Sequence, residues 1–206
     1  MDDDRREWVR TREAFTRAAG WFVETTAGAA GRWDEPALGE WTVRDLVGHT
    51  GRALSTVQRY LGEPVDTVEV RSPVEYFRRV RVLGDPAEVA RRGREAGTAL
   101  GADPAGAVAR LAGEVTTLVD GADPDALAAT PAGGMRLADY LPTRTFELTV
   151  HTCDLAAALG RPLDVPEAAA AESLSLIGSL AVQGARAGAL LRGATGRGLP
   201  SGFTVL

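Results

Sequence analysis

The chain has 206 residues, of which 45% are hydrophobic, and it carries a formal net charge of −5. A chain of this length can bury the core of one domain, whereas its acidic balance excludes the basic surface on which nucleic-acid binding depends. All 23 basic residues are arginine, so a Schiff base with a lysine side chain is excluded as well.

The cysteine content and the lengths of the hydrophobic runs indicate the cellular compartment. Cys153 is the only cysteine, so no intrachain disulfide forms and a reducing cytoplasm is the natural location. The first residues, MDDDRREW, are too polar for a signal peptide, and no apolar run approaches the ~20 residues that span a bilayer. We therefore expect a soluble, cytoplasmic protein without membrane contact, in which the small side chain of Cys153 packs against apolar neighbours.

The N-terminal part of the chain predicts two long amphipathic helices. Residues 4–27 place apolar side chains at helical spacing. A second helix begins after Thr42, which forms a capping-box pattern with Asp45, and runs to about Leu61. His49 lies at the rim of its apolar stripe, which suits a side chain that reaches into a cleft. The four tryptophans are expected in the core: Trp8, Trp21, Trp33 and Trp41.

Two Asp-Pro pairs, at residues 85–86 and 103–104, each predict a helix start, because aspartate caps a helix and proline suits its first position. The arginine-rich stretch over residues 78–94 is interrupted by acidic residues, and we interpret it as a solvated helix face. The expected elements are a loop or short extended piece over 65–72, helices over 73–83, 86–100 and 104–120, and a loop over 121–136.

The C-terminal part predicts two more helices. One begins between Leu137 and Pro142 and ends at Gly160, and Pro166 opens an alanine-rich helix that runs to about Leu191. A glycine-rich turn and one short strand-like tail follow. The whole pattern predicts an all-α fold, an antiparallel helical bundle.

The only two histidines of the chain point to a metal site. His151 follows Glu147 by four residues, so both side chains lie on one face of the predicted helix. His49 can supply a third ligand from another helix. Two imidazoles and one carboxylate leave at least one coordination position open, which is typical of a catalytic site and not of a structural zinc site.

The residues around this pair favour a metal over a surface ion pair, which is the more common role of a Glu-His pair taken alone. Arg144, Glu147, His151 and Asp154 form a narrow charged strip between two apolar walls. A buried charge needs a partner, so we expect Asp154 to orient a ligand or the second helix. We expect Arg144 to pair with a carboxylate of the protein or the substrate. The solvated arc of this helix is then the threonine face, with Thr145, Thr149 and Thr152.

Two segments resemble signatures of the mycothiol-dependent maleylpyruvate isomerase family, within the DinB/YfiT-like metal-binding four-helix bundles. They are GEWTVRDLVGHTGRA, residues 39–53, and RTFELTVHTCDLAAALGRP, residues 144–162. The resemblance covers about residues 8–162 and implies a DinB-like bundle over residues 1–162. It further implies that His49, Glu147 and His151 hold a metal, usually zinc in this family, with mycothiol as cosubstrate.

Residues 163–206 differ from the two-domain members of that family, which continue into a separate C-terminal domain. The expected helix and short tail form a truncated C-terminal part, and this favours another thiol transfer over isomerisation of maleylpyruvate. The leading hypothesis is a zinc enzyme, an S-transferase or isomerase, that activates a low-molecular-weight thiol for transfer to, or isomerisation of, an electrophilic small molecule.

Two alternatives stay open at this point. The same three ligands serve non-haem iron enzymes, and ligand identity alone does not separate zinc from iron, nickel or another divalent metal. A non-enzymatic metal-binding sensor or dimerisation module would also contain the trio. The sequence leaves the oligomeric state open, a homodimer included.

Overall fold

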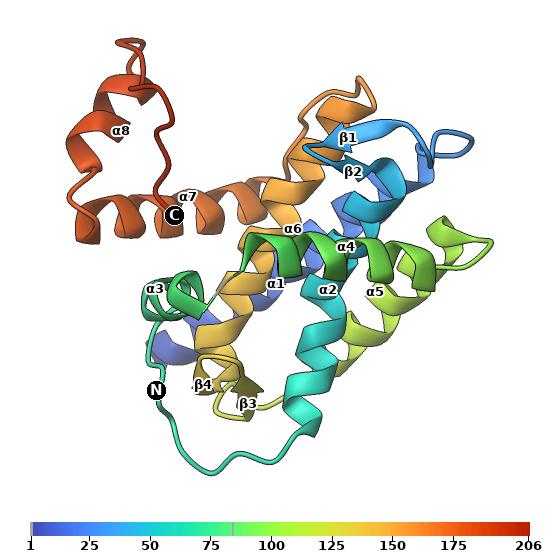
Figure 1. Ribbon diagram of the computed structural model, residues 1–206. Helices are drawn as coiled ribbons and strands as arrows, with labels where there is room; N and C mark the ends of the chain where they lie inside the picture. The colour runs from blue at the N-terminus through green and yellow to red at the C-terminus, as the bar shows by residue number, and fades with distance from the viewer. Residues whose placement is uncertain (1, 84) are drawn as a thin grey trace.

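The computed structural model describes residues 2–83 and 85–206, which are mostly helical and contain two small hairpins (Figure 1). The helices are α1 (Asp2–Ala27), α2 (Val43–Gly62), α3 (Pro73–Leu83), α4 (Pro86–Ala99), α5 (Pro104–Asp120), α6 (Leu137–Ala158), α7 (Glu167–Gln183) and α8 (Ala187–Ala194), and the strands are β1 (Pro36–Leu38), β2 (Trp41–Thr42), β3 (Leu127–Thr130) and β4 (Gly133–Arg136). None of the helices in this part of the chain is long and apolar enough to cross a membrane.

Four helices, α1, α2, α5 and α6, form the bundle. Helix α6 packs against α1 and α2, and α5 packs against the same two helices. Arg44 in α2 donates to the carbonyl of Gly101, just before α5, at 2.9 Å, so these two helices start together. Arg32, just after α1, donates to the carbonyl of Leu159 at the end of α6, also at 2.9 Å. Helices α1 and α6 therefore run in one direction and α2 and α5 in the other (Figure 1), which confirms the predicted bundle.

The core lies between these helices and is made of the apolar stripes that the sequence predicts. The largest side chains that are less than 2% exposed include Phe15 and Phe22 of α1, Leu46 and Leu54 of α2, and Leu148 and Leu155 of α6. Burial of such side chains contributes most of the favourable free energy of folding. Trp8, Trp21 and Trp41 are buried and Trp33 packs against the core, so the expected position of the tryptophans is confirmed.

The predicted helix starts are confirmed by their capping contacts. Thr42 accepts a hydrogen bond from the Asp45 backbone nitrogen, and the Asp45 carboxylate accepts one from the Thr42 backbone nitrogen, which completes the capping box of α2. Asp85 and Asp103 cap α4 and α5, each followed by proline in the first turn. These contacts are local in sequence, and sequence patterns therefore place the starts accurately.

Helix α4 crosses α2 in close contact, because glycines line the crossing. A methyl group on Gly48 of α2 would lie 2.1 Å from the backbone nitrogen of Gly97 in α4. One turn earlier in α4, a methyl group on Gly93 would lie 2.8 Å from the ring of Trp41. A side chain at Gly48 would force the two helices apart, and one at Gly93 would displace the Trp41 ring. The glycines thus allow α4 to lie close beside the turn of α2 that carries His49.

The expected loop over residues 121–136 contains a hairpin instead, formed by β3 and β4. Ala128 and Met135 are fully buried, and Val70 of the preceding extended segment donates to the carbonyl of Gly134 at 3.1 Å. Val70 pairs with Met135 from a segment distant in the sequence, and the short runs of β3 and β4 have no clear periodicity of their own. The sequence therefore predicts a loop. The strands of the second hairpin, β1 and β2, are three and two residues long, which is too short for a recognisable strand pattern.

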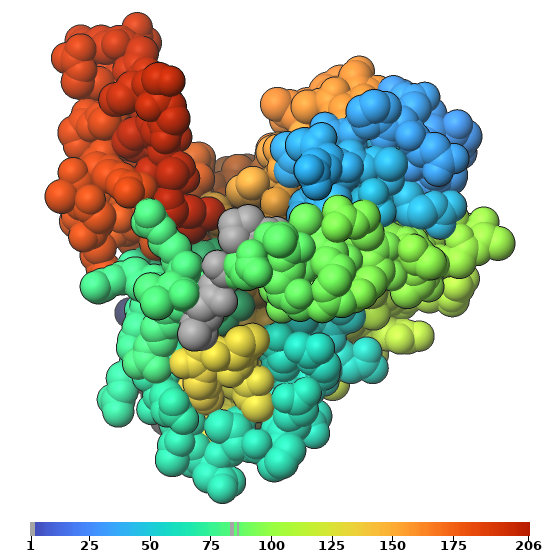
Figure 2. Space-filling model, viewed as in Figure 1, coloured from blue at the N-terminus to red at the C-terminus, as the bar shows by residue number. Residues whose placement is uncertain are grey.

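The C-terminal part also differs from expectation, because the single predicted helix is broken into α7 and α8. The break lies at Ala185, which has a φ of 55°, and Arg186 donates to the Ala181 carbonyl at 2.7 Å, as in a common helix C-terminal motif. No strand forms in residues 200–206. Helix α7 packs against α1 and α6. Helix α8 packs against α7 and has no buried residue, and together with the residues that follow it α8 stands apart from the bundle (Figure 2).

The threonine face of α6 is buried, so its assignment as the solvated arc is wrong. Thr145, Thr149 and Thr152 are at most 5% exposed. Glu172 of α7 interacts with both Thr145 and Thr11 of α1, because α7 covers this face. A threonine hydroxyl can donate to the carbonyl one turn earlier on its own helix, so burial costs it little. The sequence pattern of α6 gives no sign that another helix covers the threonines.

Candidate metal centre

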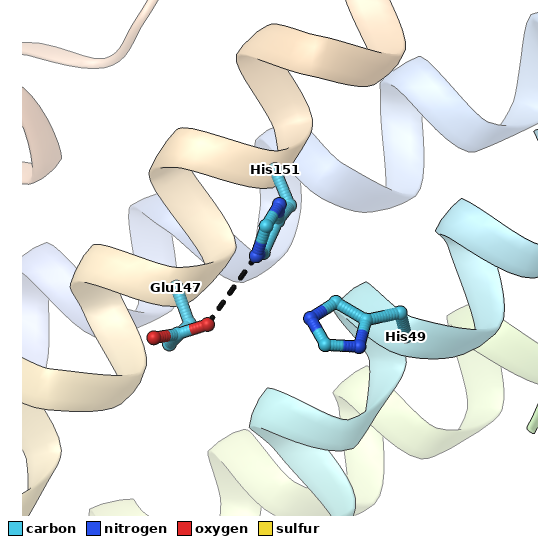
Figure 3. Close-up of side chains that lie close together, drawn as sticks. All are labelled: His49, Glu147 and His151. Atoms are coloured by element: carbon cyan, nitrogen blue, oxygen red, sulfur yellow. Dashed lines mark ion pairs between the residues drawn. The ribbon is translucent and has the colours of Figure 1, made fainter. Parts of the chain in front are cut away.

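The structure brings the three predicted ligands together between α2 and α6. Donor atoms of His49, Glu147 and His151 all lie within 4.8 Å of one another. The two imidazole rings meet edge to face with their centroids 4.7 Å apart. Figure 3 shows the three side chains pointing toward one another, one from α2 and two from adjacent turns of α6.

Hydrogen bonds on α6 orient the His151 ring. Its Nε2 atom lies 3.4 Å from the Glu147 carboxylate (Figure 3), and its Nδ1 atom lies 3.1 Å from the Asp154 carboxylate. Asp154 thus sits on the outer side of the ring, as carboxylates commonly do behind a metal-binding histidine. Glu147, His151 and Asp154 thus follow one another along α6, and Nε2 of His151 is directed at Glu147.

The pKa values of Glu147 and His151 show how strongly the pair is coupled. Burial opposes the ionisation of both groups. For Glu147 the hydrogen bond with His151 and the positive charge of Arg144 outweigh burial and lower the pKa to about 2. For His151 the hydrogen bonds with Asp154 and Glu147 outweigh burial and raise the pKa to about 9. Near neutral pH, the metal-free site therefore holds a carboxylate and an imidazolium.

His49 is in the opposite state. Burial, together with the positive charge of His151, lowers the pKa of His49 to about 4, so this imidazole is neutral near pH 7. Its Nδ1 atom is buried and has no hydrogen-bond partner among the described residues. A neutral histidine with a free nitrogen lone pair is the form that binds a metal.

Trp41 belongs to the site, although the sequence predicts only a core role for it. The centroids of the Trp41 and His49 rings lie 4.4 Å apart, with the planes tilted by 35°. The indole nitrogen donates to the Ala90 carbonyl of α4 at 3.1 Å. Trp41 therefore supports the His49 ring and links it to α4. The Trp that precedes the capped helix in the GEWTV segment is the signal for this role.

Arg144 is 8% exposed and contacts aromatic side chains. Its guanidinium carbon lies 5.3 Å from the ring centroid of Tyr76 and 5.0 Å from that of Tyr140. It donates to the Thr143 hydroxyl at 3.0 Å and to the Tyr76 hydroxyl at 3.2 Å. No carboxylate of the described residues lies within ion-pair distance, so within this part of the chain the charge acts on Glu147 through space.

A cavity of about 290 Å³ opens beside the trio, between α2, α3, α4 and α6. Its lining includes two of the three candidate ligands together with arginines, tyrosines and apolar side chains. The lining residues are His49, Arg52, Ala53, Thr56, Tyr60, Tyr76, Phe77, Val80, Val89, Arg92, Pro131, Arg144 and Glu147. A small molecule in this cavity would lie next to the open side of the trio.

The donor set fits a divalent metal. Two imidazole nitrogens and one carboxylate oxygen are ligands that zinc accepts, and they lie close enough to share one ion after small side-chain movements. The neutral imidazole of His49 and the charge of Glu147 are the features that an ion would satisfy. Three protein ligands would leave a fourth position for a water or a substrate atom.

Comparison with protein families gives a match over most of the bundle. The model of the mycothiol maleylpyruvate isomerase N-terminal domain matches residues 11–156, which include the three candidate ligands, the first resemblance segment and residues 144–156 of the second. No curated protein and no solved structure matches the chain. Because the match spans more than half of the chain, the protein belongs to the family of the mycothiol maleylpyruvate isomerase N-terminal domain.

Proposed function

We propose that the protein is a zinc-dependent enzyme that activates mycothiol, or a closely similar thiol, for transfer to or isomerisation of a small electrophile. The observation that carries the proposal is the convergence of His49, Glu147 and His151 beside a cavity. Membership of the family supports a mycothiol-associated function. Under this proposal, the three side chains would hold the metal, which would supply the charge that ionises the thiol.

The chemistry needs a thiolate, which is scarce in free solution. A thiol with a pKa of ~8.5 is only about 3% ionised at pH 7. A bound divalent metal deprotonates a coordinating thiol outright. Full ionisation raises the thiolate concentration roughly thirtyfold. A metal-bound thiolate is less basic than a free one, and this reduces the gain in rate, because nucleophilicity falls with basicity with a Brønsted slope of ~0.4–0.5.

The residues around the trio have distinct roles in this proposal. Asp154 accepts the proton on Nδ1 of His151 in a hydrogen bond, which keeps Nε2 directed at the metal position. Trp41 packs on the His49 ring and fixes its orientation. Arg144 places positive charge beside Glu147, which keeps that carboxylate ionised. The trio is thereby oriented before the substrates arrive.

The test is a measurement of thiol consumption on protein of known metal content. Purified protein is depleted of metal, reloaded with zinc, and assayed with mycothiol and a chromogenic electrophile. We expect about one zinc per chain. The rate should exceed the rate of metal-free protein by at least about tenfold, because the small ionised fraction of the free thiol limits the reaction without metal. Iron-loaded protein, prepared without oxygen, provides the comparison between metals.

Glu147→Gln is the matched variant, because it keeps the size of the side chain and removes the ligand charge. Parallel loss of zinc and of thiol consumption supports the proposal. Full consumption without metal would contradict it, because the thiol would then be activated by another group.

A further inference from the structure

Two arginines in the cavity have little or no acidic compensation. Arg52 lies on α2, one turn after His49, and Arg92 lies on α4; both are half-buried and line the cavity. No carboxylate of the described residues forms an ion pair with Arg52. Arg92 lies 4.0 Å from Glu88, whose carboxylate is bound more closely by Arg91, at 2.5 Å. Positive charge is therefore left uncompensated at this wall.

Charges near Arg52 add to this imbalance. Burial and the positive charge of Arg92 both lower the pKa of Arg52, and Arg59 and Arg144 act in the same direction. The cavity lining contains three arginines and a single acidic residue, Glu147, which the metal would engage. Placing like charges close together in a half-buried wall costs free energy, and an anion between them would recover it.

Another part of the cavity lining is apolar. Phe77 and Val80 come from α3, and Val89 comes from α4. The edge-to-face contact of Phe77 with Phe146, at 5.3 Å between ring centroids, keeps its ring in place. A ligand that fills this cavity therefore meets both guanidinium groups and hydrocarbon side chains. A cavity of about 290 Å³ lies at the small end of the range for ligand pockets.

We infer that Arg52 and Arg92 form an anion subsite, and that the electrophile is a small molecule with an apolar body and one anionic end. This inference rests on the proposed function for the reaction, although the anion subsite can be tested without it. The anionic end lies against the two guanidinium groups and the apolar body against α3. The reactive carbon then faces the trio, where the thiol sulfur is held.

One reaction that fits these positions is displacement of a halide. The thiolate sulfur attacks the benzylic carbon of para-(chloromethyl)benzoate, a carbon–sulfur bond forms, and the carbon–chlorine bond breaks. Chloride leaves with the bonding electron pair, and the thiol proton passes to solvent. The carboxylate takes no part in the bond changes, so its effect reports binding alone.

The binding experiment compares benzoate, benzamide and acetate by calorimetry on zinc-loaded protein. We expect benzoate to bind more tightly than either benzamide, which lacks the charge, or acetate, which lacks the apolar body. Arg52→Gln and Arg92→Gln should each weaken benzoate binding by about tenfold to a hundredfold, the value of a charge-assisted hydrogen bond. Arg52→Lys should retain part of the affinity, because it keeps the charge.

Arg94→Gln is the control, since Arg94 is exposed on the same helix and does not line the cavity. Equal binding of benzoate and benzamide, or benzoate binding that survives Arg52→Gln and Arg92→Gln, would overturn the anion subsite. Equal binding of acetate and benzoate would overturn the apolar wall.

The kinetic experiment compares para-(chloromethyl)benzoate with its amide as electrophiles. We expect a preference of about tenfold or more in kcat/KM for the carboxylate, abolished in Arg52→Gln and kept in Arg94→Gln. Selective benzoate binding without turnover of either electrophile supports the subsite and contradicts the thiol chemistry of the proposed function. Turnover of both electrophiles at equal rates would overturn the subsite and leave the thiol chemistry intact.

Discussion

Helix α6 presents one buried and one half-buried polar face, and they differ in the kind of polar group that they hold. On the buried threonine face Thr149 donates to the carbonyl of Thr145 at 2.7 Å, and of the three hydroxyl groups only that of Thr152 lacks a hydrogen-bond partner among the described residues. On the half-buried face His151 contacts both Glu147 and Asp154, and His49 reaches across from α2. The threonine face holds neutral groups. The ionisable face holds charged groups and has a charged cavity beside it.

The comparison shows which kind of buried polarity indicates function. Hydroxyl groups that bond to their own backbone can be buried at little cost, and they pack α6 against α1 and α7. Ionisable groups that depend on one another cost free energy to bury, and a protein that lacks a use for them would gain stability by replacing them with apolar residues. We therefore expect variants on the ionisable face to change metal binding and variants on the threonine face to change stability alone.

The largest effect should come from removing a ligand. His151→Ala should lower zinc affinity by about a hundredfold or more, because structural zinc sites bind with ~10–16 kcal/mol shared among four ligands, about 2.5–4 kcal/mol for each. The helical bundle should stay folded, since its core lies between the apolar stripes. Competition with a chromogenic chelator measures the affinity, and circular dichroism measures the fold. Unfolding of the variant would mean that the site is structural.

The second effect is a pH dependence of zinc binding. In the metal-free protein the pKa of His151 is raised to about 9, whereas His49, with a pKa of about 4, and Glu147, with a pKa of about 2, have already lost their protons at neutral pH. Zinc must therefore displace one proton, from His151. Affinity should rise about tenfold per pH unit between roughly pH 6 and pH 8 and level off above the pKa of His151. Titrations at several pH values measure the slope, and a flat profile would show that His151 is not a ligand.

Asp154→Asn should have a smaller effect, because Asp154 contacts the ligand and not the metal position. Loss of such a partner typically lowers metal affinity about tenfold to a hundredfold. The variant should also lower the pH at which the affinity levels off, since Asp154 helps to raise the pKa of His151. Both are read from the same chelator titrations. An unchanged affinity together with an unchanged levelling-off pH would remove Asp154 from the site.

The smallest effect should come from the threonine face. Thr152 is fully buried, and its hydroxyl has no hydrogen-bond partner among the described residues. Thr152→Val should therefore raise the free energy of unfolding by about 1 kcal/mol and leave zinc affinity unchanged, although the residue is next to His151 in sequence. Urea denaturation of the two proteins measures the difference. A loss of zinc affinity in this variant would erase the distinction between the two faces.

Sequence patterns predict those parts of the molecule whose causes are local. The capping residues Thr42, Asp85 and Asp103 each act on the next turn of their own helix, so the starts of α2, α4 and α5 follow directly from the sequence. The pairing of Glu147 with His151 depends on helical spacing alone. For that reason the bundle and the Glu147–His151 pair could be anticipated, whereas His49 is expected as the third ligand mainly because two segments resemble a known family.

The unpredicted features depend on contacts between distant segments. Arg92 lies in a stretch that resembles a solvated helix face, and it lines the cavity only because the glycine crossing brings α4 onto α2. The position of Trp41 against His49 has the same cause. The threonine face is buried because α7 covers it, and the sequence of α6 alone does not indicate that another helix packs there.

The most direct test of the central claim uses cobalt in place of zinc, because cobalt reports its ligands through its absorption spectrum. Mycothiol is added to protein loaded with one cobalt ion per chain, and His151→Ala serves as the control. The account predicts a new sulfur-to-cobalt charge-transfer band that saturates at one thiol per chain and is absent from the control. A spectrum that shows bound cobalt but does not change when the thiol is added would contradict the claim that this site binds and activates a thiol.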